Sequence, residues 1–300
     1  MINTDVLAWI VIAAFVLGAL LESRNRRLAR YVSGGTWMLF GVFWLALFPQ
    51  FWFEMRSFIE GALSLIALPA CVYTGYLLLR GRDSLFVLSR AVAVMGLIYL
   101  PAETIPIVRQ VLIETVAYQT HVVMDWLGYQ HEFIVGPNDY QSGFLFTEES
   151  GQQYLTYIVL ACTGIGSMAI FGGLIAAVKA PLKRKLQGLV LAVAIIWVLN
   201  IARNVFIAVA FGNQWFQFYV DPLLRLTGYD HPGYISFFIA DRVISQSLSV
   251  VALIGIAILV IRIVPELIAI ADEVLFVLTG TEYDLQTALQ PSVRADGGRD

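Results

Sequence analysis

Long apolar stretches, separated by short polar segments, run through almost the whole chain. A helix needs roughly 20 apolar residues to cross a hydrocarbon core of about 30 Å. Seven stretches approach or exceed that length, at about Val6–Leu21, Tyr31–Phe48, Phe58–Leu79, Leu85–Leu100, Gln153–Val178, Gly188–Phe211 and Ser236–Ile263. The pattern predicts an all-α fold, a polytopic membrane bundle of about seven transmembrane helices.

The composition also indicates a membrane protein. Of the 300 residues, 59% are hydrophobic and 14% are charged, and the mean hydropathy is +0.75. Soluble chains average about 45–50% apolar and about 25% charged residues, so too few charges remain to cover a water-soluble globule of this size. Outside its short loops the chain has no dense basic patch, and we expect no nucleic-acid partner.

Every second loop is rich in positive charge. The first, third and fifth loops carry Arg24, Arg26, Arg27 and Arg30, then Arg80 and Arg82, then Lys179, Lys183, Arg184 and Lys185. The loops between them hold little positive charge. Short cytoplasmic loops are enriched in Lys and Arg, so we expect the N-terminus outside and the C-terminus in the cytoplasm.

A long polar segment, Pro101–Gln152, interrupts the apolar stretches, and we expect it on the external side. Its part Ile105–Leu127 has a helical spacing of apolar residues, which favours an interfacial or re-entrant helix. Its part Gly136–Gly151 is rich in Gly, Asn, Ser and Glu, and we expect a solvated loop there.

The C-terminal end differs from the rest of the chain. Pro265–Leu278 has the pattern of an amphipathic surface helix, and a polar tail follows it. We therefore expect one transmembrane domain, residues 1–264 with the external region 101–152, followed by a cytoplasmic helix and tail, residues 265–300.

Two arginines interrupt the apolar stretches, Arg203 in the sixth and Arg242 in the seventh. A charged side chain at the centre of a membrane helix costs at least about 2.5–3.5 kcal/mol, so those that persist usually face the protein interior and have a function. Snorkelling to a headgroup, or pairing with a buried acid, is the alternative for both. Counting about 1.5 Å per residue along the last three stretches places Cys162, Arg203 and Arg242 at one level, in the outer third of the membrane.

A thiol beside permanent positive charge can act as a nucleophile, because neighbouring cations stabilise the thiolate. Arginine stays charged at any relevant pH and can donate hydrogen bonds to an oxyanion. Cys162, Arg203 and Arg242 are therefore the candidate catalytic residues. Cys71 lies mid-span without nearby charge, so we expect a packing role, which is also the alternative for Cys162. The different depths of the two cysteines argue against a disulfide.

The three histidines, His121, His131 and His231, all fall in external regions. They show no metal-ligand spacing, so we expect neither a metal site nor a cofactor. His231 precedes the seventh stretch by only a few residues, and it is a candidate proton donor.

The ordered motifs of the last three stretches resemble those of the exosortase/archaeosortase superfamily. These motifs are Ala161-Cys162-Thr163-Gly164 near the outer end of one span, Arg203-Asn204 in the next, and Arg242 near the start of the following one. The resemblance covers the chain at least from the third span through the seventh. It is greatest to the archaeosortase branch, since exosortases generally have a histidine at the position of Arg242.

The resemblance implies a membrane-embedded cysteine transpeptidase, a thiol peptidase of the hydrolase class, with Cys162 as nucleophile and Arg203 and Arg242 as its partners. Its substrates would be surface proteins, such as an S-layer glycoprotein, that end in a sorting signal. That signal consists of a Pro-Gly-Phe type motif, an apolar span and a basic cytoplasmic end. Cleavage would accompany transfer of the new C-terminus to a membrane lipid, which is the second expected partner.

Several points remain open at the level of sequence. The general acid for the departing amine could be His231, Asp241, Tyr157 or a water. A transporter or channel for an anion or anionic lipid, bound by Arg203 and Arg242, is the main alternative function. A non-catalytic assembly factor whose charges pair with partner helices is another. We expect a multi-pass protein of an archaeal cell membrane, with its active site near the extracytoplasmic face.

Overall fold

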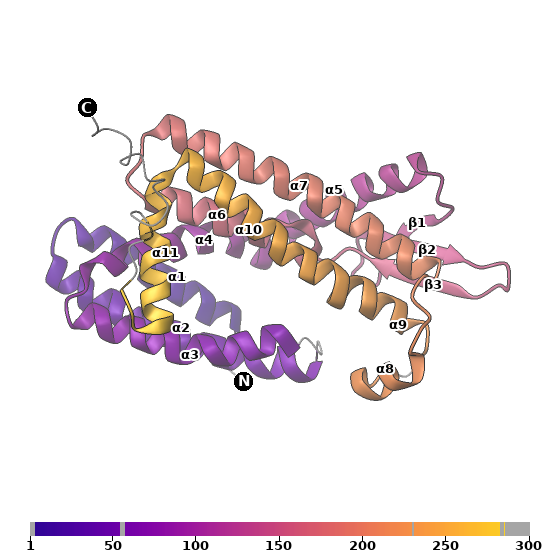
Figure 1. Ribbon diagram of the computed structural model, residues 1–300, viewed down its shortest axis with the longest axis horizontal. Helices are drawn as coiled ribbons and strands as arrows, with labels where there is room; N and C mark the ends of the chain where they lie inside the picture. The colour runs from indigo at the N-terminus through magenta and orange to yellow at the C-terminus, as the bar shows by residue number, and fades with distance from the viewer. Residues whose placement is uncertain (1–3, 55–57, 230, 283–284, 286–300) are drawn as a thin grey trace, which may run out of the picture. The chain divides into compact units, whose positions relative to one another are not determined.

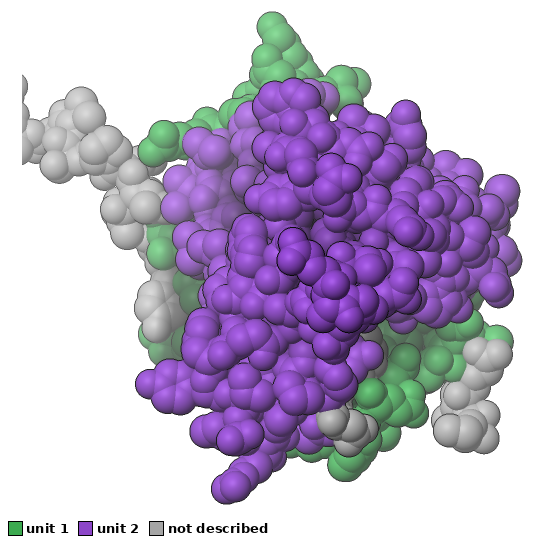
Figure 2. All heavy atoms as spheres, turned by 90° about the vertical axis from the view of Figure 1, so that its right-hand side faces the viewer, with its two compact units in different colours: residues 1–97, 172–188, 261–300 green, residues 98–171, 189–260 purple. Residues whose placement is uncertain are grey.

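The computed structural model describes residues 4–54, 58–229, 231–282 and 285. Over these residues the protein is mainly helical and carries one three-stranded sheet (Figure 1). Internal contacts divide the chain into two compact units, which are coloured separately in Figure 2. Unit 1 comprises residues 1–97, 172–188 and 261–300, and unit 2 comprises residues 98–171 and 189–260.

Six helical segments in the described part of the chain are long and apolar enough to cross a membrane. They contain α1 (Thr4–Glu22), α2 (Arg26–Pro49), α3 (Phe58–Leu79), α4 (Phe86–Thr104), α7 (Leu182–Gly212), and the run of α9 (Tyr234–Phe237), a π-helical segment (Phe238–Ser245) and α10 (Gln246–Ile263). Six of the seven expected spans are thus confirmed as helices. The multi-pass membrane architecture agrees with the apolar pattern.

The fifth expected span, Gln153–Val178, is wrong as a single helix. Its first residues form strand β3 (Gln153–Tyr157), a 3-10 turn follows, and only α6 (Ile165–Ala177) is α-helical. The 13 residues of α6 extend about 20 Å, which is less than the thickness of a hydrocarbon core of about 30 Å. The error arose because β3 is apolar enough to extend the run, while its backbone pairs in a sheet.

The polar segment Pro101–Gln152, which we expect on the external side, contains the expected helix and an unexpected sheet. The helix is α5 (Pro106–Trp126), and its first residue is a proline, whose missing N–H is no loss at that position. The expected solvated loop Gly136–Gly151 instead contains the whole of β2 (Gln141–Thr147), which pairs antiparallel with β1 (Glu132–Val135) on one edge and with β3 on the other. Strand β2 is therefore the centre of the sheet.

Alternating burial explains why β2 forms despite its small and polar residues. Phe144 and Phe146 are 0% and 3% exposed, and both belong to the hydrophobic core of unit 2. Side chains of a strand point alternately to its two faces, so these two rings share the face that packs on the core. Most other members of the core come from α5, α7 and the segment after β3, among them Met124, Leu160 and Val209.

The C-terminal helix is confirmed as α11 (Ile268–Thr279), which follows a short 3-10 turn. Ile268 and Ile270 are buried, and the Glu273 carboxylate lies 2.9 Å from Nε of Arg82, so α11 is held within unit 1. Most of the expected polar tail lies outside the described residues. A further short helix, α8 (Val220–Thr227), precedes α9.

Helices α2 and α3 of unit 1 approach closely through small residues. A Cβ on Gly75 would come within 2.5 Å of the carbonyl oxygen of Gly34, and one on Gly41 would lie 3.2 Å from Cys71. Small residues let membrane helices pack with their backbones close together. Cys71 is 5% exposed at this contact, which agrees with the packing role expected for it.

Candidate active site

Cys162 lies in a single 3-10 turn, Leu160–Thr163, between β3 and α6. The Thr163 hydroxyl donates to the carbonyl oxygen of Leu160 at 2.7 Å and closes the turn. Gly164 follows with a φ of 77°, a left-handed conformation that glycine adopts without strain. The turn presents Cys162, a free cysteine and a partly exposed residue, at the edge of the hydrophobic core of unit 2.

Two asparagines of α7 hold the backbone of Cys162. The side-chain amides of Asn200 and Asn204 both donate to the Cys162 carbonyl oxygen, at 2.7 and 2.8 Å. Residues four apart lie on one face of a helix, and both side chains are buried. Because a carbonyl oxygen has two lone pairs, this pair occupies both and fixes the orientation of the turn.

Arg203 lies on the same face of α7 as the two asparagines, at helical spacing. Burial raises the pKa of the Cys162 thiol, and the Arg203 guanidinium opposes that rise through its positive charge and a hydrogen bond to the sulfur. Nη2 of Arg203 also donates to Oδ1 of Asp241 at 2.6 Å. The side chains of Arg203 and Asp241 are 26% and 13% exposed, so this ion pair is only partly solvated.

Asp241 lies between two guanidiniums. Its Oδ2 is 3.5 Å from Nε of Arg242, and the Arg242 side chain is 26% exposed. Both residues belong to the π-helical segment Phe238–Ser245. Such segments are rare and are frequently found at functional sites. The single carboxylate therefore links Arg242 to Arg203, which itself faces the thiol.

The structure brings together the three residues that the depth count placed at one level. Cys162 and Arg203 face each other, and Arg242 joins them through Asp241. The alternative considered for both arginines, pairing with an acid, is observed as well, because Asp241 pairs with both. Asp241 is thus a fourth member of the candidate site.

Two of the candidate proton donors are not brought to the thiol. Tyr157 ends β3 and is 40% exposed. His231 is exposed, and its Nδ1 accepts a hydrogen bond from the backbone N–H of Gly233 at 3.0 Å. Among the described residues, no hydrogen bond joins Tyr157 or His231 to the Cys162 thiol. Asp241, the third candidate, is engaged by the guanidiniums.

Sequence reasoning missed the roles of Asn200 and Asn204. The available signal was their four-residue spacing, which puts both asparagines on the face of α7 that carries Arg203. Nothing in the sequence indicates that both bind the same carbonyl. Sequence spacing also did not reveal a cluster of two histidines and an aspartate. Within the described residues, His121, Asp125 and His131 form the one set whose ligand atoms all lie within 4.8 Å of one another.

The arrangement around Cys162 has the parts of a nucleophilic site. A thiol stands on a backbone that two amides fix, and a guanidinium held by a carboxylate faces the sulfur. A cation beside a thiol favours the nucleophilic thiolate, and guanidinium N–H groups can donate to a developing oxyanion.

Comparison with known proteins gives matches along nearly the whole chain. Residues 2–234 match a family model described as transmembrane exosortase. The chain is 50% identical over 296 residues to archaeosortase A of Haloferax volcanii. The aligned segment covers 95% of this chain and 97% of that protein. It is 49% identical over 298 residues to archaeosortase A of Natronomonas pharaonis, with 97% and 92% covered. No solved structure matches the chain.

Proposed function

The chain belongs to the transmembrane exosortase family, and from that premise we propose that it is an archaeosortase-type cysteine transpeptidase with Cys162 as nucleophile. Two archaeosortases are about half identical to it over almost its full length, which supports an enzyme that processes C-terminal signals in a membrane. The observation that carries the residue assignment is the Arg203 guanidinium, held by Asp241 at 2.6 Å and facing the Cys162 thiol. Neither relative is a transporter, and we do not retain that alternative.

The first chemical step is attack by the Cys162 sulfur on a backbone carbonyl carbon at the sorting signal. Arg203 favours the thiolate, and Asp241 keeps the guanidinium in place. As the C–S bond forms, the carbonyl oxygen gains negative charge, and the N–H groups of Arg203 and Arg242 donate to it. The C–N bond then breaks, leaving an acyl thioester on Cys162.

The departing amine needs a proton, and we assign that proton to a water molecule at Cys162, a partly exposed residue. Asp241 acts as a positioning residue in this scheme, because its two oxygens face the two guanidiniums. His231 and Tyr157 have no described contact with the thiol. A hydroxyl group of a membrane lipid then attacks the thioester carbonyl and gives its proton to the hydroxide left by that water. The C–S bond breaks, which regenerates the thiolate and anchors the product.

The expected topology suits this substrate. The basic loops argue for a cytoplasmic C-terminus, with the site near the extracytoplasmic face. A substrate whose basic end stays in the cytoplasm presents the start of its apolar span at that same face. The Pro-Gly-Phe type motif would therefore reach the level of Cys162, where lipid headgroups also lie.

The direct test is to trap the thioester. The full chain, reconstituted in lipid nanodiscs, is incubated with a synthetic peptide that carries a Pro-Gly-Phe motif, an apolar span and a basic end, then quenched in acid. Mass spectrometry should find the acyl adduct on the peptide containing Cys162, and neutral hydroxylamine should release it. An adduct on Cys71, or peptide cleavage that persists in Cys162→Ala, would contradict the proposal.

A further inference from the structure

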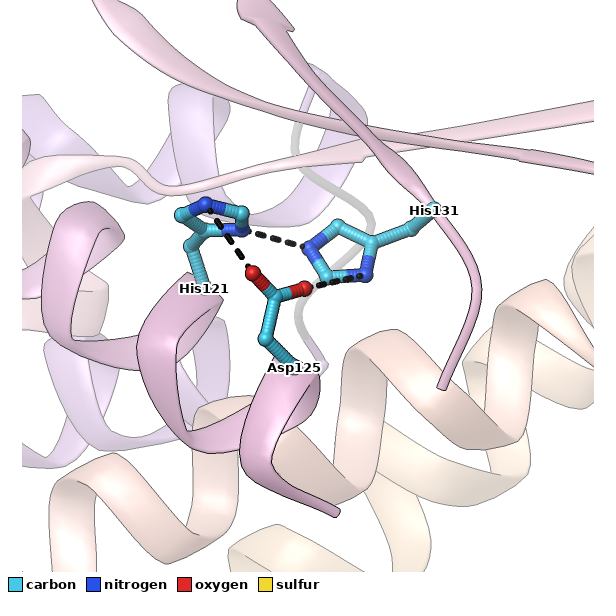
Figure 3. A group of neighbouring side chains, drawn as sticks. All are labelled: His121, Asp125 and His131. Atoms are coloured by element: carbon cyan, nitrogen blue, oxygen red, sulfur yellow. Dashed lines mark hydrogen bonds and ion pairs between the residues drawn. The ribbon is translucent and has the colours of Figure 1, made fainter. Parts of the chain in front are cut away.

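Two imidazoles and a carboxylate meet where α5 ends and the chain turns toward β1 (Figure 3). Nδ1 of His121 lies 2.9 Å from Nε2 of His131. The other ring nitrogen of His121, Nε2, lies 3.4 Å from Oδ2 of Asp125, and Oδ1 of Asp125 lies 3.9 Å from Nδ1 of His131. Figure 3 shows the carboxylate turned toward both rings. No step proposed for Cys162 uses this cluster.

Aromatic side chains fix both imidazole rings. The His131 side chain is fully buried, and its ring centroid lies 5.8 Å from that of Phe144 and 5.7 Å from that of Phe146. The His121 ring stacks on Phe133 at 4.7 Å. Asp125, by contrast, is 56% exposed. The imidazoles are therefore held in place by the protein, while the carboxylate opens the cluster to solvent.

The hydrogen bonds determine which nitrogens carry protons. Nδ1 of His131 lies 3.0 Å from the carbonyl oxygen of Tyr129. A carbonyl can only accept, so this nitrogen carries the proton and donates. Nε2 of a neutral His131 is then bare, and its lone pair points at Nδ1 of His121.

A neutral His121 cannot satisfy both of its neighbours. If its proton is on Nδ1, it donates to His131 but turns a lone pair toward the Asp125 carboxylate. If its proton is on Nε2, it donates to Asp125 but leaves two bare nitrogens facing each other at 2.9 Å. A cation between the two bare nitrogens removes this conflict, since His121 then keeps its proton for Asp125.

We propose that His121, His131 and Asp125 bind one divalent transition-metal ion of the zinc type. Nδ1 of His121 and Nε2 of His131 are the imidazole ligands. Oδ2 of Asp125 accepts from the Nε2–H of His121, 3.4 Å away, and the other carboxylate oxygen, Oδ1, is the third ligand. In a tetrahedral zinc site with Zn–N bonds of about 2.0–2.1 Å, two ligand nitrogens lie about 3.3 Å apart, so the rings need to separate by only a few tenths of an ångström. A backbone carbonyl that accepts from the second ring nitrogen, as Tyr129 does, is the usual support of a metal-bound histidine.

The bound ion would join α5 to the sheet. His121 and Asp125 belong to α5, whereas His131 immediately precedes β1, the partner of β2. Strand β3 of the same sheet leads directly into the turn of Cys162. The ion would therefore stabilise the scaffold that carries the turn, without contact with the thiol.

The test uses the full-length protein in detergent, stripped with a chelator, and titrated with Zn²⁺ alone by calorimetry. We expect one equivalent to bind and to raise the melting temperature. His121→Gln and Asp125→Asn should each weaken binding at least tenfold. The chain has only one other histidine, so His231→Gln is the matched control and should bind as the wild type does.

Other results would overturn the proposal. The first is a wild-type protein that does not bind one equivalent of Zn²⁺. The second is an Asp125→Asn variant that binds Zn²⁺ as tightly as the wild type, since a change at this exposed position should leave folding intact. Unchanged melting temperatures without Zn²⁺ verify that each variant is folded. If Zn²⁺ has no effect but His121→Gln changes the pH dependence of the melting temperature, a proton rather than a metal bridges the cluster, and the metal site is rejected.

Discussion

Cys71 and Cys162 carry the same thiol in opposite surroundings. Cys71, in unit 1, is buried against Gly41 where two helices pack through small residues. Cys162, in unit 2, lies on a 3-10 turn, is partly exposed, and faces the guanidinium of Arg203. The comparison teaches that the surroundings, not the residue type, separate a packing residue from a candidate nucleophile.

Two arginine–carboxylate pairs extend the comparison. Arg90 and Glu22 in unit 1, and Arg203 and Asp241 in unit 2, each approach to 2.6 Å with similar partial burial. Arg90 also donates to a backbone carbonyl at 3.3 Å. Arg203 instead faces the Cys162 thiol. Similar ion pairs thus serve structure in one unit and, in our proposal, chemistry in the other.

The largest effect should come from the two thiols. Cys162→Ala is expected to lower peptide processing by at least roughly 10³-fold, the scale on which loss of a nucleophile acts in other hydrolases. Cys71→Ala should retain processing and lose about 1 kcal/mol of stability from weaker packing. Accumulation of substrate with its C-terminal tail intact measures the first effect, and thermal unfolding measures the second. Equal activities in the two variants would remove the contrast.

The next largest effect should distinguish Arg203 from Arg90, when each is replaced by lysine. Arg203→Lys keeps the charge but loses the forked donor geometry, and we expect turnover to fall by roughly 10²–10³-fold, as when an oxyanion donor is removed. Arg90→Lys is the matched control and should change turnover little. If Arg203→Lys retained turnover, the guanidinium would act only as a point charge.

The carboxylate is expected to matter less than the guanidinium it holds. Asp241→Asn preserves shape but weakens a charged hydrogen bond worth about 1.5–3 kcal/mol, so kcat should fall by roughly 10- to 100-fold while KM changes little. The rate of Cys162 alkylation should fall in parallel. Glu22→Gln provides the corresponding change in unit 1, where we expect a stability loss without a change in kcat.

The smallest effect should come from the two amides that hold the Cys162 carbonyl. Asn200→Ala and Asn204→Ala should each cost about 1 kcal/mol of stability, measured by thermal unfolding. The double variant leaves the carbonyl without either partner and should lose more than the sum. Asn213→Ala, which removes an amide that donates from just beyond the end of α7 to the carbonyl oxygen of Val209, is the control. Additive losses would mean that the carbonyl finds another donor.

Most of the membrane architecture could be predicted from the sequence, because burial in lipid requires long apolar runs that are visible in one dimension. The sheet could not. Strand β2 contains Ser142 and Gly143, which are typical of loops, and its burial depends on pairing with β1 and β3. The strand Gln153–Tyr157 was likewise read as part of a helix because its pairing partner lies elsewhere in the chain.

The candidate site was predictable where depth along helices decides position. That count placed Cys162, Arg203 and Arg242 together. It could not reveal that Asn200 and Asn204 bind one carbonyl. Every residue has a backbone carbonyl, so the residue type of the acceptor gives no indication of such a hydrogen bond. The pairing of His121 with His131 was also hidden, because ten residues and the end of α5 separate them.

The doubly held carbonyl of Cys162 limits which partner can move when the sulfur attacks the substrate. Any swing of the sulfur that turns the adjoining peptide plane would break two amide contacts at once. The backbone that carries the nucleophile is therefore held in place. Apart from rotation about its own Cα–Cβ bond, the sulfur has little freedom to move, so the incoming polypeptide must supply most of the approach, and selectivity resides in how well a sorting signal can bend toward this site.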